Sequence, residues 1–193
     1  MAIDDTRYYQ TFYGLRTEDW ASDFGGLADH NTFLVKDYLS DAVSCPSKTP
    51  WTSSGTKFLY PHRIKKTYFI EGVVEGHITF SSVSNSVHGF LSSWVSDYRV
   101  TISKMHNDTT ETELATTGVI AVNDSFATIG GVETERVYPF WIDVNEPKAL
   151  NENERILLKI EWDIDNSSSI TASLTHWNDS STEDIKIILP FAL

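Results

Sequence analysis

Residues 155–165 read RILLKIEWDID, and this stretch decides the fold class. Every second position is apolar and the positions between are mostly polar; the apolar set is Ile156, Leu158, Ile160, Trp162 and Ile164. A period of two predicts a β-strand with one face in a core and the other toward water or a partner. Burial of five such side chains stabilises a fold by roughly 1.5–3 kcal/mol each, before the entropy cost. The pattern is explained by structure alone and requires no chemistry.

The same period recurs along most of the chain from about residue 64. It predicts seven or eight strands and no helices between them, with strands expected at 67–83, 96–106, 112–123, 135–144, 155–165, 169–177 and 184–193. Gly72 and Gly76 are candidate bulge or bend sites, and Gly118 falls inside an expected strand. Pro139 predicts an edge strand, because proline donates no ladder hydrogen bond. Residues 145–154, NEPKALNENE, are expected to connect two strands. Short strands separated by turn signals favour an all-β, antiparallel β-sandwich with a jelly-roll-like layout.

Residues 1 to about 60 differ from the rest because they lack regular alternation. They carry many aromatic residues among turn-forming and acidic residues, and residues 44–57 have the composition of a loop. Only residues 29–40, DHNTFLVKDYLS, have a helical pattern, with Asp29 or Asn31 as its cap. We therefore expect an N-terminal extended arm over 1–60 that contains a short helix, followed by a sandwich domain over 61–193.

Composition limits the function. The 193 residues suit one domain that buries a core without disulfides, and Cys45 is the only cysteine. The formal net charge of −12 argues against nucleic acid or an anionic membrane as a partner, since both require a basic face. No signal peptide and no apolar run long enough to span a bilayer is present, which predicts folding in a cytoplasm.

Candidate chemical sites are few. Glu161 and Asp163 share one strand face, as a glycosidase acid pair could, but solvated surface carboxylates explain them better. His77 and His88 could approach each other across a hairpin, yet no zinc-ligand spacing occurs. The loops 107–113 and 163–169 are rich in oxygen ligands for calcium but lack EF-hand spacing. There is no GxSxG, phosphate-binding loop or dinucleotide motif, so we predict no catalytic residue, no metal ligand and no cofactor.

Two tryptophans fall on the outer faces of their expected strands. Trp141 and Trp177 could stack on a sugar ring or bury against another subunit, and both uses need an exposed flat face. We favour the subunit contact.

The layout of residues 67–191 resembles that of known virus proteins. It carries IEGVVEGHITFSS (70–82), then DYRVTISKMHNDTTETELATTG (97–118), then VYPFWIDVNEPKALNENERILLKIEWD (137–163). This succession is similar to β-sandwich and jelly-roll components of tailed bacterial or archaeal viruses, such as head decoration, turret, neck and tail-surface proteins. The resemblance is one of layout and transfers no functional residue.

The resemblance implies a non-enzymatic virion structural protein that forms a symmetric homo-oligomer on the particle. Its partners would be copies of itself and other virion proteins such as the major capsid protein, without nucleic acid or membrane, and it would be made in the host cytoplasm. The alternative is a carbohydrate-binding or host-receptor-binding module, and a glycoside hydrolase is a more distant one. The residues expected at interfaces are Tyr8, Tyr9, Phe12, Tyr13, Trp20, Trp141 and Trp177.

Overall fold

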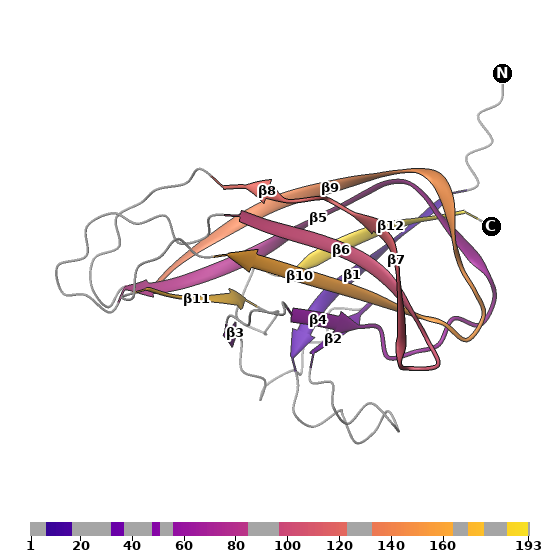
Figure 1. Ribbon diagram of the computed structural model, residues 1–193, viewed down its shortest axis with the longest axis horizontal. Helices are drawn as coiled ribbons and strands as arrows, with labels where there is room; N and C mark the ends of the chain where they lie inside the picture. The colour runs from indigo at the N-terminus through magenta and orange to yellow at the C-terminus, as the bar shows by residue number, and fades with distance from the viewer. Residues whose placement is uncertain are drawn as a thin grey trace.

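The computed structural model describes residues 7–16, 32–36, 48–50, 56–84, 97–122, 133–163, 170–175 and 185–192, and within them it is all-β. Long strands run lengthwise along the body (Figure 1). The strands are β1 (Tyr8–Arg16), β2 (Thr32–Val35), β3 (Lys48–Pro50), β4 (Thr56–Leu59), β5 (Tyr68–Ser84), β6 (Asp97–His106), β7 (Thr110–Thr116), β8 (Ile120–Ala121), β9 (Glu133–Leu150), β10 (Arg155–Asp163), β11 (Ile170–Thr175) and β12 (Lys186–Ala192).

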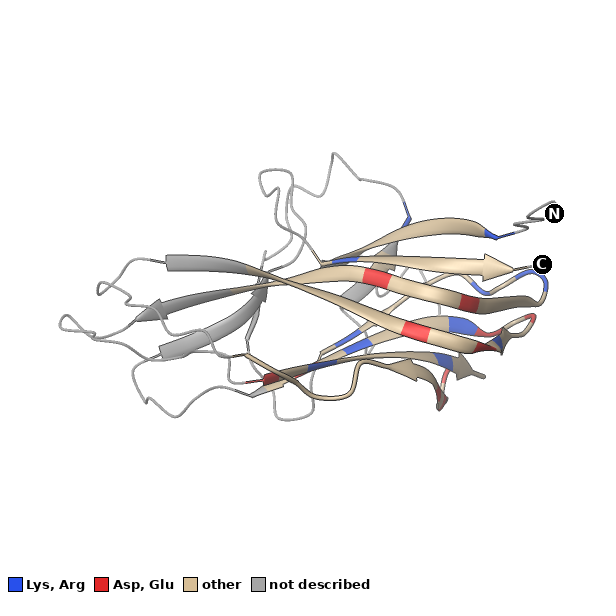
Figure 2. Ribbon diagram, turned by 90° about the horizontal axis from the view of Figure 1, so that it is seen from above, with Lys and Arg blue, Asp and Glu red and all other residues tan. Residues whose placement is uncertain are grey.

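Hydrogen bonds join these strands in the order β3-β11-β5-β12-β1-β2-β4-β10-β6-β7, with β9 added beside β5 and β8 beside β6. Among the described strands, every pairing is antiparallel except the single bridge Phe33↔Leu59 between β2 and β4. Phe80 of β5 nevertheless packs against Tyr98 of β6 and Trp162 of β10, far away in that order. The sheet therefore folds back on itself into two facing layers, an arrangement that can be followed in Figure 2.

Alternation along each strand fills the space between the layers, as the sequence predicts. On β10, Ile156, Leu158, Ile160 and Trp162 are at most 6% exposed. The inward faces of β6, β9 and β12 are equally buried, with Tyr98, Val100 and Ile102; Tyr138, Phe140, Ile142 and Val144; and Ile187, Leu189 and Phe191. The alternating residues of these four strands thus belong to the core, which also includes Phe12, Leu34 and Phe58 from the predicted arm.

The opposite face of β10 differs from the prediction. Leu157 was expected between the buried positions on the polar face, yet it is fully buried, as is its cross-strand neighbour Leu59 on β4. Lys159 and Glu161 on that face are half-buried. An apolar side chain at an outward position is evidence that part of this face is covered too.

Two glycines of β5 have different roles. Gly72 has φ +110°, and the pairing with β9 shifts register between Ile70 and Gly72, so the predicted bulge is confirmed there. Gly76 is not a bulge. A Cβ at Gly76 would lie 2.2 Å from the carbonyl oxygen of Lys186 and 2.7 Å from the Phe140 ring, so glycine allows the neighbouring strand and ring to approach closely.

Two strand boundaries differ from those expected, and one edge position agrees. Strand β9 continues through residues 145–150, the first part of the predicted connector 145–154, because β5 extends past its bulge and pairs with residues 148–150. Gly118 lies between β7 and β8 with φ +69° and not inside a strand, since a left-handed residue ends the ladder. Pro139 lies on an edge as predicted, because in the described part of the chain β9 pairs with β5 alone.

The N-terminal segment contributes strands to the sheet. Strand β1 pairs with β12 and with β2, so part of the predicted arm is built into the body. The helix expected over 29–40 is wrong at residues 32–35, which form β2, because the β-favouring sequence TFLV gains ladder hydrogen bonds from β1. The rest of that helix, residues 29–31 and 37–40, lies outside the described residues. The division at residue 60 stays a prediction.

Candidate functional site

An open cavity lies at the end of the body where β1 begins and β12 ends. Its volume is about 320 Å³, and its walls come from β1, β10, β12, Lys36 and the 60–68 segment that enters β5. Aromatic rings form much of the wall and basic side chains stand among them. The lining residues are Tyr8, Phe12, Lys36, Tyr60, His62, Arg63, Ile64, Lys65, Tyr68, Ile156 and Phe191.

The rings of this cavity support one another. Tyr8 stacks on Phe191 with 5.4 Å between ring centroids, and Tyr68 meets both rings edge-on. Phe12 meets Tyr60 edge-on at 5.3 Å. Each such ring pair stabilises the fold by about 0.5–1.5 kcal/mol beyond the contribution of the buried area. Burial and the neighbouring Tyr68 raise the pKa of Tyr8 above its ordinary value of 10.0, so its hydroxyl stays a hydrogen-bond donor at physiological pH.

Three cationic side chains line the cavity, and no carboxylate is among the lining residues. The Lys36 ammonium lies 5.4 Å from the Tyr60 ring centroid and 5.9 Å from that of Phe12, which is cation–π distance. Among the described residues, neither Lys36 nor Lys65 forms an ion pair. In a chain of net charge −12, such a site concentrates positive charge where the rest of the molecule is acidic.

Backbone hydrogen bonds fix the 60–64 wall to the turn before β10. Tyr60 N–H donates to the Ile156 carbonyl at 2.8 Å and Ile64 N–H to the Glu154 carbonyl at 2.9 Å. The Asn153 N–H donates in return to the Ile64 carbonyl at 2.8 Å. The wall is therefore positioned by the sheet, which is the condition for a preformed site.

Asp108 lies at the centre of an ion-pair network beneath this wall. Its carboxylate accepts from Arg155 Nε at 2.7 Å and from an Arg63 amino group, while Arg63 also donates to the Asn153 carbonyl at 2.8 Å. Asp108 itself has φ +59°, in the turn that the sequence suggested as a calcium loop. Its oxygens bind two guanidinium groups instead, so this carboxylate orients the cavity wall.

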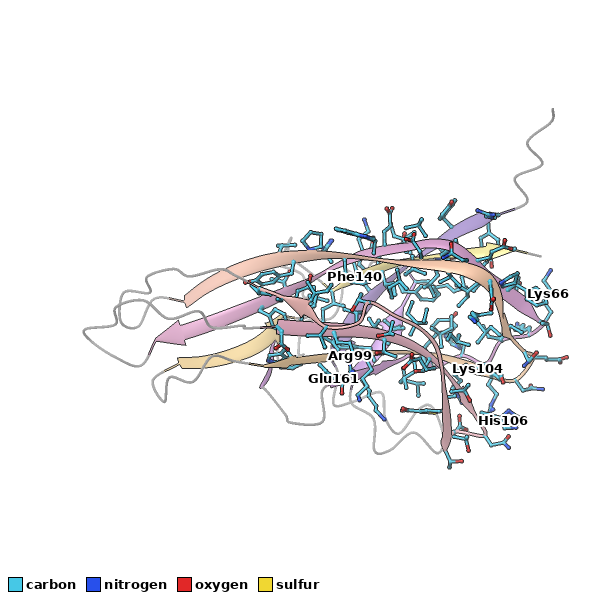
Figure 3. The ribbon with its side chains drawn as sticks, turned by 45° about the horizontal axis from the view of Figure 1, so that its top comes forward. Lys66, Arg99, Lys104, His106, Phe140 and Glu161 are labelled. Carbon is cyan, nitrogen blue, oxygen red and sulfur yellow. The ribbon has the colours of Figure 1, made fainter. Side chains whose placement is uncertain are left out.

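Glu154 is a buried carboxylate that holds the same turn. It accepts from the Asn151 N–H at 2.7 Å and forms an ion pair with Lys104 at 3.1 Å, and it is 5% exposed. Burial raises its pKa, but the hydrogen bonds from Asn151 and Lys104 outweigh burial and hold the pKa below the ordinary value of 4.5. Figure 3 shows Lys104 and His106 along β6 at this end of the molecule.

The other predicted chemical sites are not assembled in the described residues. Partial burial raises the pKa of Glu161, but hydrogen bonds from Lys159 and Arg99 hold it below its ordinary value, which does not suit a glycosidase proton donor. Within the ranges described above, no group of three or more His, Cys, Asp or Glu residues could hold a metal ion. His88 and most of the loop 163–169 lie outside those ranges.

The structure places the residues predicted at interfaces in different environments. Phe12 is 1% exposed inside the chain's own core, so it is not available to a neighbouring subunit; alternation along β1 turns it inward. Tyr8 lines the cavity at 40% exposure, Tyr9 is 58% exposed, and Tyr13 is half-buried. Trp141 is 65% exposed on β9. Trp20 and Trp177 lie outside the described residues, and the interface role of the exposed residues stays a prediction.

Sequence reasoning missed the cavity because its walls combine distant segments. Residues 61–66, PHRIKK, offered a signal: they gather three basic residues in a chain that has only 15. Lys36 and Tyr60 fall in the segment read as an arm, so their meeting over one cavity required the sheet pairing. In Figure 3 Lys66 marks the place where the PHRIKK segment enters β5.

No protein-family model matches the sequence, and no curated protein does. Solved structures do share the fold. A CocE/NonD family hydrolase from Staphylococcus aureus aligns with a TM-score of 0.53 at 12% identity, over 96% of this chain and 37% of the hydrolase. An aminopeptidase from a marine sediment Thaumarchaeota archaeon aligns with a TM-score of 0.55 at 9% identity, over 97% of this chain and 37% of that enzyme. The chain thus spans just over a third of the length of the enzymes it matches.

Virus proteins are also similar, but much more weakly. The infectious bursal disease virus subviral particle protein aligns with a TM-score of 0.22 at 11% identity, over all of this chain and 58% of that protein. A TM-score this low gives a weak likeness to a capsid protein and carries no argument. No family model of a tailed-virus protein matches the sequence.

These findings correct the prediction that the chain is not an enzyme. That prediction was based on absent motifs, while the structures that share this fold with TM-scores above 0.5 include a hydrolase and an aminopeptidase. At 12% identity or less the likeness establishes the fold, and the reaction is a matter for proposal. In the described part of the chain, no helix has the length and apolar character needed to cross a membrane.

Proposed function

We propose that the chain is a β-sandwich module of a hydrolase, and that its open cavity binds a ring-bearing ligand with an anionic group. The hydrolase context is supported by the alignment of nearly the whole chain with just over a third of two hydrolytic enzymes. The jelly-roll-like connectivity expected from the sequence is part of the same proposal.

The observation that carries the binding role is the composition of the cavity. Lys36, Arg63 and Lys65 stand among five aromatic rings, and no carboxylate lines the space. A ligand ring can stack on Tyr8 or Tyr60 while its anionic group meets the Lys36 ammonium. A charge-assisted hydrogen bond of this kind is about twice as strong as a neutral one.

The chemistry of hydrolysis fits such a ligand. Cleavage of an ester or amide leaves a carboxylic acid, which is ionised at neutral pH. A cavity that recognises the acid part of a substrate or product would hold it in place beside a catalytic centre. We therefore assign to the cavity a role in substrate specificity.

The binding experiment is a titration of the full chain with two probes of nearly the same shape, N-acetylphenylalanine, which carries a carboxylate, and its amide, which carries a neutral carboxamide. We expect the acid to bind about 10-fold more tightly, with an affinity that falls as salt rises. Lys36→Gln should remove the preference, while Lys148→Gln on β9, outside the cavity, should leave it unchanged. Equal affinity for both probes would contradict the binding role.

The hydrolase context has its own test, which uses the mono-p-nitrophenyl ester of phenylsuccinic acid, a ring-bearing substrate that keeps one free carboxylate for Lys36. The chain, or a complex containing it isolated from the source cells, should release p-nitrophenol, and Lys36→Gln should raise KM while leaving kcat near the native value. Absence of turnover from both preparations would remove the hydrolase context and leave the binding result standing.

Assembly on a virus particle, a place in the virion and virion partners remain predictions from the sequence, and no observation in the described residues favours them over the cavity. The glycan alternative gains one specific observation, the exposure of Trp141, which leads to a second site.

A further inference from the structure

Trp141 stands beside a second hollow, on the outer surface of β9, β5 and β12. The hollow has a volume of about 490 Å³ and shares no residue with the cavity at the end of the body. Trp141 is 65% exposed, which is unusual for so large an apolar side chain on a single-chain surface. Val73 lines the same hollow and is 47% exposed, and adjoining exposed apolar side chains in a hollow mark an interaction site.

Pairing places the side chains of this surface in two rows across three strands. One row is Trp141, Glu75 and Ile188, and the next is Pro139, His77 and Lys186. Strands lie about 4.8 Å apart and successive rows about 6.7 Å apart, so the two rows cover roughly the area of one or two sugar rings.

The floor of this surface is rigid. The Phe140 ring lies against Gly76 on the core side of the same strands, where a Cβ at Gly76 would come within 2.7 Å of it. Phe140 is 1% exposed, and Figure 3 shows it on the inner side of β9. This close packing fixes the backbone of β5 and β9, from which Glu75 and Trp141 project.

The chemical character of the two rows matches a carbohydrate. A pyranose has an apolar C–H face that stacks on an indole ring and a rim of hydroxyls that both donate and accept hydrogen bonds. Glu75 supplies acceptors and Lys186 supplies donors at the side of the indole. Among the described residues, neither of these two side chains makes an ion pair, so both remain available to hydroxyls.

Charge argues against a second copy as the occupant, and backbone hydrogen bonding argues against an added strand. A second copy of this chain would bring another net charge of −12 to the surface, while one carboxylate and one ammonium make the hollow itself close to neutral. Strand addition along β9 is opposed by Pro139, which lacks the N–H needed for a continuous ladder. A neutral ligand meets neither obstacle.

We propose that the Trp141 hollow is a carbohydrate-binding site for neutral oligosaccharides. The proposal is independent of the role assigned to the end cavity, because the two sites share no residue and each has its own probe.

The experiment is calorimetric titration of the full chain with cellohexaose, xylohexaose, mannohexaose and chitohexaose. We expect at least one of them to bind, and Trp141→Ala to weaken that binding about 10-fold or more. Trp141→Phe should retain part of the affinity, and Glu75→Gln should weaken it by a smaller factor. Val137→Ala is the matched control, because Val137 is 43% exposed on the same strand and lies outside the hollow.

Three results would overturn the proposal. The first is that no oligosaccharide of the panel binds a chain whose circular dichroism shows it folded. The second is binding that survives both Trp141 variants. The third is concentration-dependent self-association in light scattering that Trp141→Ala abolishes, which would assign the surface to a second copy. If Trp141→Ala fails to fold, Trp141→Phe and Glu75→Gln provide the same test.

Discussion

Two aromatic clusters lie at opposite ends of the sandwich, and their surroundings differ. The closed cluster consists of Phe80, Tyr98, Tyr138 and Trp162, each at most 8% exposed. The open cluster consists of Tyr8, Tyr60, Tyr68 and Phe191 and borders the end cavity. Both contain rings packed at tilted or edge-on angles with centroids 5–7 Å apart, within the range usual for aromatic pairs.

What separates the clusters is charge and access to solvent, since the ring types are similar. Around the closed cluster, the Tyr98 hydroxyl donates to the Pro139 carbonyl at 2.9 Å, and burial raises its pKa. Around the open cluster, Lys36 stands over the Tyr60 and Phe12 rings. An aromatic cluster therefore contributes to the core where it is closed to solvent, and to binding where cations and open space adjoin it.

The largest effect is expected in the closed cluster. Phe80→Ala removes a fully buried ring that contacts three others, so we expect the free energy of unfolding to fall by about 3–5 kcal/mol. Urea denaturation followed by tryptophan fluorescence measures it. Val119→Ala, at a 67% exposed position, is the control and should change stability by less than about 0.5 kcal/mol. A loss as small as the control's would mean that the two layers do not pack as described.

The second effect concerns the turn that supports the open end. Glu154→Gln removes the charge that Lys104 and the Asn151 N–H bind, and we expect a loss of about 2 kcal/mol at neutral pH. The pKa of Glu154 is lowered in the folded state, so its contribution is fully present above the ordinary value of 4.5 and is lost as pH falls through the folded pKa.

The pH profile tests that assignment. Native protein should lose stability below pH 4.5 more steeply than Glu154→Gln, and the two curves should converge in acid. Glu146→Gln serves as the control, because the Glu146 side chain is 86% exposed and its pairing with Lys148 should contribute little. Parallel curves for native protein and Glu154→Gln would show that another carboxylate governs the acid transition.

The closed cluster could be predicted from the sequence to a greater extent than the open one. Tyr98, Tyr138 and Trp162 belong to strands with strict alternation, so their inward direction follows from local period alone. The open cluster depends on β1 pairing with β12, from opposite ends of the chain, and on residues 60–64 bonding to the 151–156 turn. No local pattern encodes such long-range pairing, and that is why a strand was read as an arm and TFLV as a helix.

A smaller effect on stability is expected at the edge of the open cluster. Tyr8→Ala removes a ring that is 40% exposed and stacked on Phe191, and we expect a loss of about 1 kcal/mol. Tyr8→Ala should also weaken the binding of N-acetylphenylalanine, and by a larger factor than the small decrease in the folded fraction would cause. The comparison with Tyr9→Ala, one position along β1 and 58% exposed, controls for loss of a surface tyrosine. Equal effects of the two variants on binding would exclude Tyr8 from the ligand site.

The smallest effect is expected on the outer surface beside the closed cluster. Arg99 and Glu161 are paired residues of β6 and β10, joined at 2.7 and 2.9 Å, and Figure 3 shows them side by side. The Arg99 side chain is 45% exposed, so Arg99→Gln should cost less than about 1 kcal/mol, and added salt should reduce that cost further.

The same substitution has a second readout that stability does not give. Without Arg99, Lys159 is the remaining partner of Glu161 among the described residues, so the pKa of Glu161 should move up toward the ordinary value, as an NMR titration of its side-chain carboxyl would show. If Arg99→Gln instead caused a large loss that salt did not reduce, the closed cluster would depend on charge as the open one does. The distinction between the two ends of the molecule would then rest on solvent access alone.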